Sequence, residues 1–183
     1  MTESQAESLR LLSALLLYPD DAFLQDLDAV ESAAGKLHSA EMTTAIDAFL
    51  RYLKTHSPIQ LQECYTAVFD MNPSTTLNLT HHIYGDNAKR AAALAHLQQI
   101  YEAAGWERIT GELPDFLPLM LEFLATAPDA DNGDLIWLCL RGLEGCLAGL
   151  RQTAPAYAAL LQPLVDMAAA QPGSDGRQGH LPE

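Results

Sequence analysis

Apolar residues recur every three or four positions in at least six segments of this 183-residue chain. This spacing places them on one face of an α-helix. Leu9, Leu12 and Leu16 form such a stripe, which ends before Pro19. No strand pattern and no internal repeat competes with these segments. We therefore expect an all-α fold, a single helical domain of seven or eight helices over residues 1–170. Residues 171–183 hold three glycines and two prolines and are expected to form a disordered tail.

Residues that favour helix starts place several boundaries. The residues expected to cap a helix start are Asp20 or Asp21, Ser39, Ser57 and Asp115. Pro58 and Pro118 then fall in the first turns of their helices, where a missing N–H breaks no hydrogen bond. The helix after Asp20 or Asp21 is expected to run to Gly35. The segment from Phe116 to Ala125 is apolar nearly all round, which indicates a buried helix. Two further helices are expected over about 132–152 and 155–170.

The helical pattern breaks between Asp70 and Asp86, where the chain reads DMNPSTTLNLTHHIYGD. Seventeen residues without a helical period are too many for a mere connector in a compact domain. Long ordered loops of this kind are often functional. We therefore expect this segment to lie beside a binding site.

Acidic residues outnumber basic ones, with 24 Asp and Glu against 10 Lys and Arg and a formal net charge of −14. Such a surface repels phosphates, so a nucleic-acid partner is not expected. Residues 102–150 carry nine acids and two bases. This local excess favours a basic partner or serves solubility.

Cysteine usage and hydropathy indicate a soluble protein of a reducing compartment. The chain has an odd number of cysteines, Cys64, Cys139 and Cys146, and they form no CxxC motif. We expect them to be small core residues. The leucine-rich start contains Arg10 and follows acidic residues, unlike a signal peptide. No segment is apolar for long enough to span a bilayer. The expected location is cytoplasmic, with no stable membrane insertion.

The chain shows none of the common phosphate-binding, dinucleotide, serine-hydrolase or zinc-protease motifs. His81 and His82 are adjacent, and Asp86 is the nearby carboxylate. A metal-dependent enzyme that uses these residues is one hypothesis. A loop histidine that hydrogen-bonds the backbone is the interpretation we prefer.

Two helix faces combine unusual residues. Asp115, Pro118 and Glu122 are spaced by three and four residues, so they lie on one stripe of a helix. The stripe either faces solvent or is covered by other residues. If it is covered, the Glu122 carboxylate requires a partner. Glycines share a face at positions 142, 145 and 149. That smooth face predicts either close packing of another helix or a groove for a peptide.

Three strings resemble the NarJ family of cytoplasmic chaperones, which assemble respiratory nitrate reductase and are related to the TorD-type and DmsD-type chaperones. The strings are LQECYTAVFD (61–70), HHIYGDNAKRAAAL (81–94) and ELPDFLPLMLEFL (112–124). The resemblance covers about residues 5–165. One departure is Ala91 after Arg90, where the family typically has an Arg-Gly pair.

The resemblance implies an all-helical chaperone, not an enzyme, that binds the N-terminal peptide of the catalytic (alpha) subunit of nitrate reductase. It would hold that subunit open for insertion of the molybdenum cofactor, which belongs to the client and is not bound permanently by the chaperone. The matching positions, candidates for binding the client peptide, are Glu63, Tyr65, Phe69, Asp70, His82, Gly85, Asp86, Arg90, Pro114, Asp115, Pro118, Glu122 and Phe123. For Tyr65 and Phe69, core packing is the competing interpretation. A chaperone for another molybdoenzyme, or a general helical adaptor, is the alternative function among binding proteins.

Overall fold

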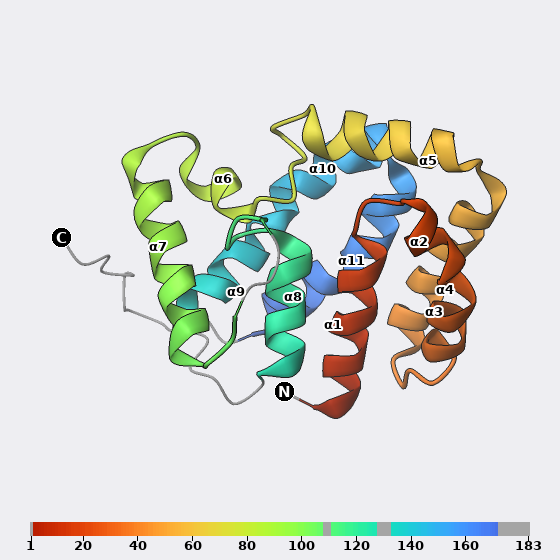
Figure 1. The fold of residues 1–183 in the computed structure, drawn as a ribbon, viewed down its shortest axis with the longest axis horizontal. Coiled ribbons are helices and arrows are strands. Elements are labelled where there is room, and N and C mark those ends of the chain that lie inside the picture. Colours follow the sequence, from red (N-terminus) through yellow and green to blue (C-terminus); the bar gives the residue numbers. More distant parts are fainter. Residues whose placement is uncertain (1, 108–110, 128–132, 172–183) are drawn as a thin grey trace.

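The structure, a computed structural model, describes residues 2–107, 111–127 and 133–171. Within these ranges the regular elements are helices (Figure 1). One isolated β-bridge pairs Asn78 with Phe116. The elements are α1 (Glu3–Leu15), α2 (Asp21–Gln25), α3 (Leu27–Ala34), α4 (Ala40–Thr55), α5 (Pro58–Tyr65), the π-helix η1 (Thr66–Asp70), α6 (Leu79–Tyr84), α7 (Ala88–Ala103), α8 (Leu117–Thr126), α9 (Gly133–Arg141), α10 (Leu143–Thr153) and α11 (Pro155–Ala170). The expected all-α class is confirmed.

Local capping signals placed most helix starts correctly. Asp20 accepts a hydrogen bond from the Phe23 backbone N–H at 2.8 Å and begins α2, and Ser39 caps α4. Ser57 forms a capping box ahead of Pro58, the first residue of α5. The last helix, α11, has the predicted range, whereas the tail expected over 171–183 lies outside the described residues beyond Gln171.

Two predicted helices are each divided in the structure. The helix expected from Asp20 or Asp21 to Gly35 is α2 and α3, separated at Asp26. Aspartate has a low helix propensity, although the Asp26 side chain makes no capping hydrogen bond here. The helix expected over about 132–152 is α9 and α10, which meet at Gly142. Glycine lowers helix stability there.

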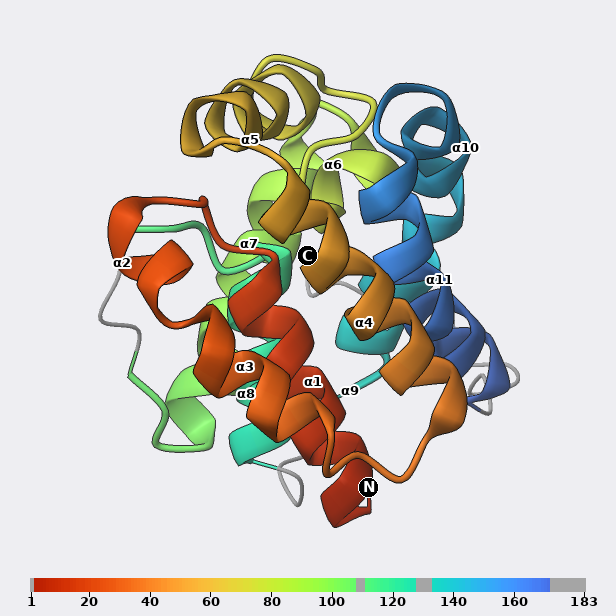
Figure 2. The ribbon, with the colours of Figure 1, turned by 90° about the vertical axis from the view of Figure 1, so that its right-hand side faces the viewer.

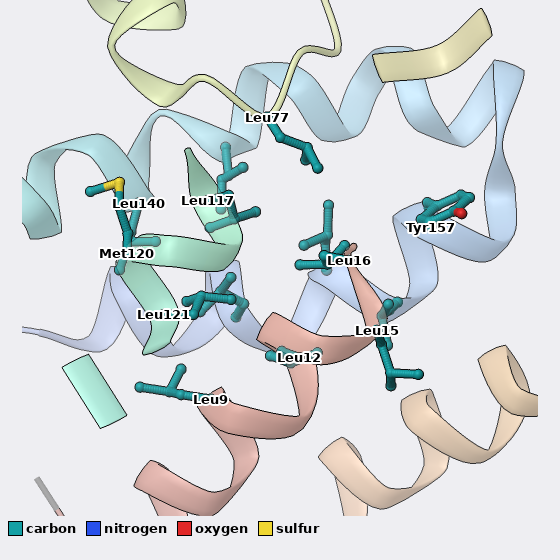
Figure 3. Close-up of a cluster of buried hydrophobic side chains, with 14 of the residues drawn as sticks. Leu9, Leu12, Leu15, Leu16, Leu77, Leu117, Met120, Leu121, Leu140 and Tyr157 are labelled. Atoms are coloured by element: carbon teal, nitrogen blue, oxygen red, sulfur yellow. The ribbon is translucent and has the colours of Figure 1, made fainter. Parts of the chain in front are cut away.

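Helix α1 packs along α8, and the pair lies beside α11, which is flanked by α4 and α10 (Figures 1 and 2). Leu9, Leu12 and Leu16 of the α1 segment are fully buried, so the predicted stripe forms part of the core (Figure 3). Helix α8 is buried on nearly all sides, as expected, and contributes Met120 and Leu121 to the same core. No helix in the described ranges is long and apolar enough to cross a membrane.

The segment from Asp70 to Asp86 is more regular than its sequence predicts. Residues 79–84 form α6, so the expectation of a continuous loop was wrong there. Backbone pairing anchors the segment, because Leu79 N–H donates to Asp115 O at 3.0 Å and Leu117 N–H donates to Leu77 O at 2.8 Å. These contacts come from distant sequence and leave no periodic signal in the segment itself.

Candidate functional site

A groove of about 1310 Å³ lies between the end of α1, the α2–α3 pair, η1 and the start of α8. Its larger apolar side chains are Leu11, Leu17, Tyr18, Phe23, Val30, Tyr65, Phe69, Leu77, Phe116 and Leu119. Leu17 and Tyr18 remain 45% and 44% exposed at its edge. Clustered exposed apolar side chains in a concave surface are typical of a binding site.

The charged residues that line the groove are all acidic among the residues that the structure describes. They are Asp20, Asp26, Asp70, Glu112 and Glu122. Carboxylates gathered in a cleft with apolar walls concentrate a negative potential there. The groove therefore favours an occupant that combines apolar and cationic groups.

Tyr65 and Phe69 pack in the core, as one interpretation of the sequence expects, and they also line the groove. Each is only 4% exposed, and their rings meet edge to face with centroids 4.9 Å apart. The Tyr65 hydroxyl donates to Leu16 O at 3.0 Å. Burial raises the pKa of Tyr65, so this hydroxyl keeps its proton. Both residues are core residues that also form part of the groove wall.

Asp115 does not cap α8, contrary to prediction. The N-cap is Phe116, and Pro118 is the second residue of the helix. Asp115 is fully buried, and its Oδ2 accepts hydrogen bonds from the Thr80 backbone N–H at 3.1 Å and the Thr80 hydroxyl at 2.5 Å. The backbone pairing of residues 77–79 with 115–117 directs this carboxylate at Thr80 instead of at α8.

Arg90 continues the network around Asp115 at the start of α7. Its guanidinium lies 4.0 Å from Asp115 Oδ2, donates to Thr80 Oγ1, and forms an ion pair with the exposed Asp86 at 3.3 Å. Gly85 ends α6 with a φ of 58°, a conformation that glycine adopts without strain. Gly85, Asp86 and Arg90 thus organise the turn between α6 and α7 outside the large groove.

The two adjacent histidines serve different local contacts. His82 Nε2 donates to Thr76 O at 2.7 Å, which confirms the expected bond to the backbone, but His82 lies in helix α6 and not in a loop. Burial is the main reason that the pKa of His82 is lowered, which favours the neutral ring. His81 lies 3.5 Å from Asp86. Across the described part of the chain, no group of three or more His, Cys, Asp or Glu residues is placed to hold a metal ion.

A second cavity of about 200 Å³ lies beside the groove. Its lining residues are Phe69, Asp70, Pro73, Thr76, Asn78, His81 and Arg90. Four of them, Phe69, Asp70, Thr76 and Asn78, line the large groove as well. The expected binding segment, 70–86, therefore borders both spaces.

The fold brings only some of the residues that the sequence offers as binding candidates into the groove. Tyr65, Phe69, Asp70, Pro118 and Glu122 line the groove, and Glu122 is exposed there. The remaining candidates lie elsewhere: Glu63 is exposed outside the groove, Pro114 O accepts the Tyr101 hydroxyl, and Phe123 packs in the core against Tyr101 and Trp106. Sequence reasoning missed the groove residues of α1–α3, although the apolar pair Leu17 and Tyr18 just before Pro19 is a usable signal.

The glycine face of α10 packs closely at two of its three positions. A Cβ at Gly149 would lie 3.0 Å from Thr75 Cγ2, and one at Gly142 would lie 3.4 Å from Ile83 Cγ1. Gly145 has open space. Close packing against residues 75–83 therefore explains this face, and the large groove lies elsewhere.

The cysteines largely follow the core prediction. Cys139 and Cys146 are fully buried, and Cys64 is half-buried. Burial raises the pKa of Cys139 to about 12 and that of Cys146 to about 11. Both buried thiols therefore stay protonated and unreactive at neutral pH.

Comparisons with known proteins find relatives in sequence and a solved structure with the same fold. The chain is 35% identical over 162 residues to the nitrate reductase molybdenum cofactor assembly chaperone NarJ of Escherichia coli (strain K12), covering 87% of this chain and 69% of the relative. It is 30% identical over 154 residues to a probable NarJ chaperone of Bacillus subtilis (strain 168), covering 84% of each. A solved structure from Archaeoglobus fulgidus, described as a redox enzyme maturation protein, shares the fold with a TM-score of 0.59 at 20% identity, over 90% of this chain and 93% of the other.

The resemblance to NarJ proteins noted in the sequence is confirmed by these matches. The family model described as the nitrate reductase delta subunit matches residues 36–168, which is most of the chain. The chain therefore belongs to the nitrate reductase delta subunit family.

Proposed function

We propose that this protein is a chaperone that binds the N-terminal segment of the apo catalytic subunit of a nitrate reductase and supports insertion of its molybdenum cofactor. The observation that carries the proposal is the large groove, with apolar walls and acidic side chains but no basic residue among the described residues that line it. The names of the relatives, which describe nitrate reductase molybdenum cofactor assembly chaperones, supply the client.

The size of the groove supports a peptide occupant. Its volume of about 1310 Å³ exceeds what a drug-sized ligand needs, which is about 300–1,000 Å³. An amphipathic helix places its apolar side chains in such a groove and leaves cationic side chains at the edge. Apolar contact then provides most of the affinity, while the acidic lining speeds encounter and selects charge.

The molybdenum cofactor is cargo of the client in this proposal. The chaperone holds the client segment and performs no catalytic turnover, in keeping with relatives that are named for assembly. The proposed location is the cytoplasm, where the apo subunit is folded.

A titration with peptide tests the proposal. The full chain is titrated by calorimetry with a synthetic peptide of about 20 residues from the N-terminus of the nitrate reductase catalytic subunit of the same organism, and with a matching peptide from another molybdoenzyme. Leu17→Asp places a charge on the groove edge, whereas Leu138→Asp alters a similarly exposed leucine, 39% exposed, outside the groove.

We expect the nitrate reductase peptide to bind wild type and Leu138→Asp alike, and Leu17→Asp to weaken binding at least tenfold, since burying an unpaired charge is costly. Preference for the other peptide would assign a different client. Equal binding by both variants would contradict use of the groove.

A further inference from the structure

Three residues with polar side chains, Asp70, Thr76 and Asn78, lie where the groove meets the small cavity. Asp70 and Asn78 line both spaces, whose volumes are about 1310 and 200 Å³. Phe69 and Thr76 complete the shared wall. An apolar groove thus opens at this junction into a polar recess.

Asp70 offers an exposed carboxylate at the junction. It is the last residue of η1. Turns of π-helix are rare in proteins as a whole, but those that occur are often found at functional sites. None of the ion pairs within residues 2–107, 111–127 and 133–171 involves Asp70. Its charge is therefore available to an incoming cation.

Asn78 adds an acceptor that has no donor. Its side-chain Oδ1 is buried and receives no hydrogen bond from the part of the chain that the structure describes. A buried acceptor without a donor is unfavourable. A donor that an occupant of the junction brings to Oδ1 would relieve that cost.

Arg90, which also lines the small cavity, does not neutralise the junction. Its guanidinium is already engaged by Asp86 at 3.3 Å and lies 4.0 Å from the buried Asp115. Asp86 and Asp115 balance its charge, and they leave Asp70 as the unpaired charge of the recess.

We infer that this junction is a subsite for one arginine side chain of the bound segment, paired with Asp70 and hydrogen-bonded to Asn78. The inference rests on the proposed function, since it concerns the same groove. Arginine suits the site because its planar guanidinium carries five N–H donors and serves two acceptors at once. The apolar stem of that side chain would lie along the shared wall at Phe69.

The test uses two peptides, each prepared with arginine and with citrulline, which keeps the shape of arginine but carries no charge. One peptide is the N-terminal segment of the nitrate reductase catalytic subunit, and the other is a designed amphipathic helix with a leucine face and one arginine. The full-length proteins are wild type, Asp70→Asn, Asn78→Ala and the control Asp47→Asn, which neutralises an exposed carboxylate of α4 outside the groove. Circular dichroism verifies that each variant folds.

We expect Asp70→Asn to weaken binding of the arginine peptides about 3- to 10-fold and that of the citrulline peptides less than about 2-fold. Asn78→Ala should also reduce the preference for arginine over citrulline, and Asp47→Asn should leave it unchanged. Equal losses for arginine and citrulline in Asp70→Asn, or an unchanged preference in Asn78→Ala, would overturn the subsite. If only the designed peptide binds, with the Asp70 dependence, the subsite stands and the proposed client falls. If neither peptide binds, both fall.

Discussion

Replacing Asp115 by alanine is expected to lower the free energy of unfolding by about 3–5 kcal/mol. The carboxylate accepts two hydrogen bonds from Thr80, and both residues are fully buried. Hydrogen bonds to a charged group contribute about 1.5–3 kcal/mol each, and the variant leaves two Thr80 donors without a partner. The nearby Arg90 also loses one of its two counter-charges.

Urea unfolding at pH 7, followed by circular dichroism, measures this loss. With a slope of about 2 kcal/mol/M, the midpoint should fall by about 1.5–2.5 M. The control is Asp86→Ala, which removes the exposed carboxylate beside Arg90 and should cost no more than about 1 kcal/mol. The double variant Asp115→Ala/Thr80→Val should lose less free energy of unfolding than the sum of the losses of the two single variants. The valine removes the Thr80 hydroxyl, which is one of the two donors left without a partner by Asp115→Ala. A loss for Asp115→Ala no larger than that for Asp86→Ala would refute this account of the buried network.

Three further outcomes are expected. Because the pKa of His82 is lowered in the folded protein, the unfolded chain protonates this histidine first as the pH falls through about 6.5. The free energy of unfolding from urea titrations should therefore fall between pH 7.5 and 5.5, and fall less in His82→Gln. An equal fall in wild type and His82→Gln would contradict this. Gly145→Ala should raise stability by about 0.5–1 kcal/mol, whereas Gly149→Ala should give no gain because its Cβ would meet Thr75 at 3.0 Å; equal melting-temperature gains would disprove the packing argument. Raising salt from about 0.05 to 0.5 M shortens the Debye length from about 14 to 4 Å and should slow peptide association several-fold in stopped-flow while binding persists; loss of all binding would mean that charge dominates.

The sequence predicted what local chemistry decides. Helix starts at Asp20, Ser39 and Ser57 were found because a capping side chain lies within three residues of the N–H that it serves. Asp115 has the same local features, yet it was misassigned. Pairing with residues 77–79, far away in the sequence, determines where its carboxylate points.

Five of the thirteen residues that the sequence offers as candidates for client binding line the groove. Tyr65, Phe69, Asp70, Pro118 and Glu122 were selected through their matching strings, and they line the groove from α5, η1 and α8. The groove residues of α1 to α3 were missed, because an exposed leucine or tyrosine is ordinary on a protein surface. Only the tertiary arrangement shows that Leu17 and Tyr18 face a concavity shared with η1 and α8.

The wall formed by α2 has an evolutionary consequence. This five-residue helix buries none of its side chains, yet Ala22 and Phe23 line the groove. Substitutions at poorly buried positions usually change stability by no more than about 0.5 kcal/mol. Mutation can therefore alter the contour of the groove at α2 while the leucine core of α1 and α8 is preserved. Under the proposed function, exposed positions of α2 such as Ala22 are places where relatives can acquire different client preferences at little cost to folding.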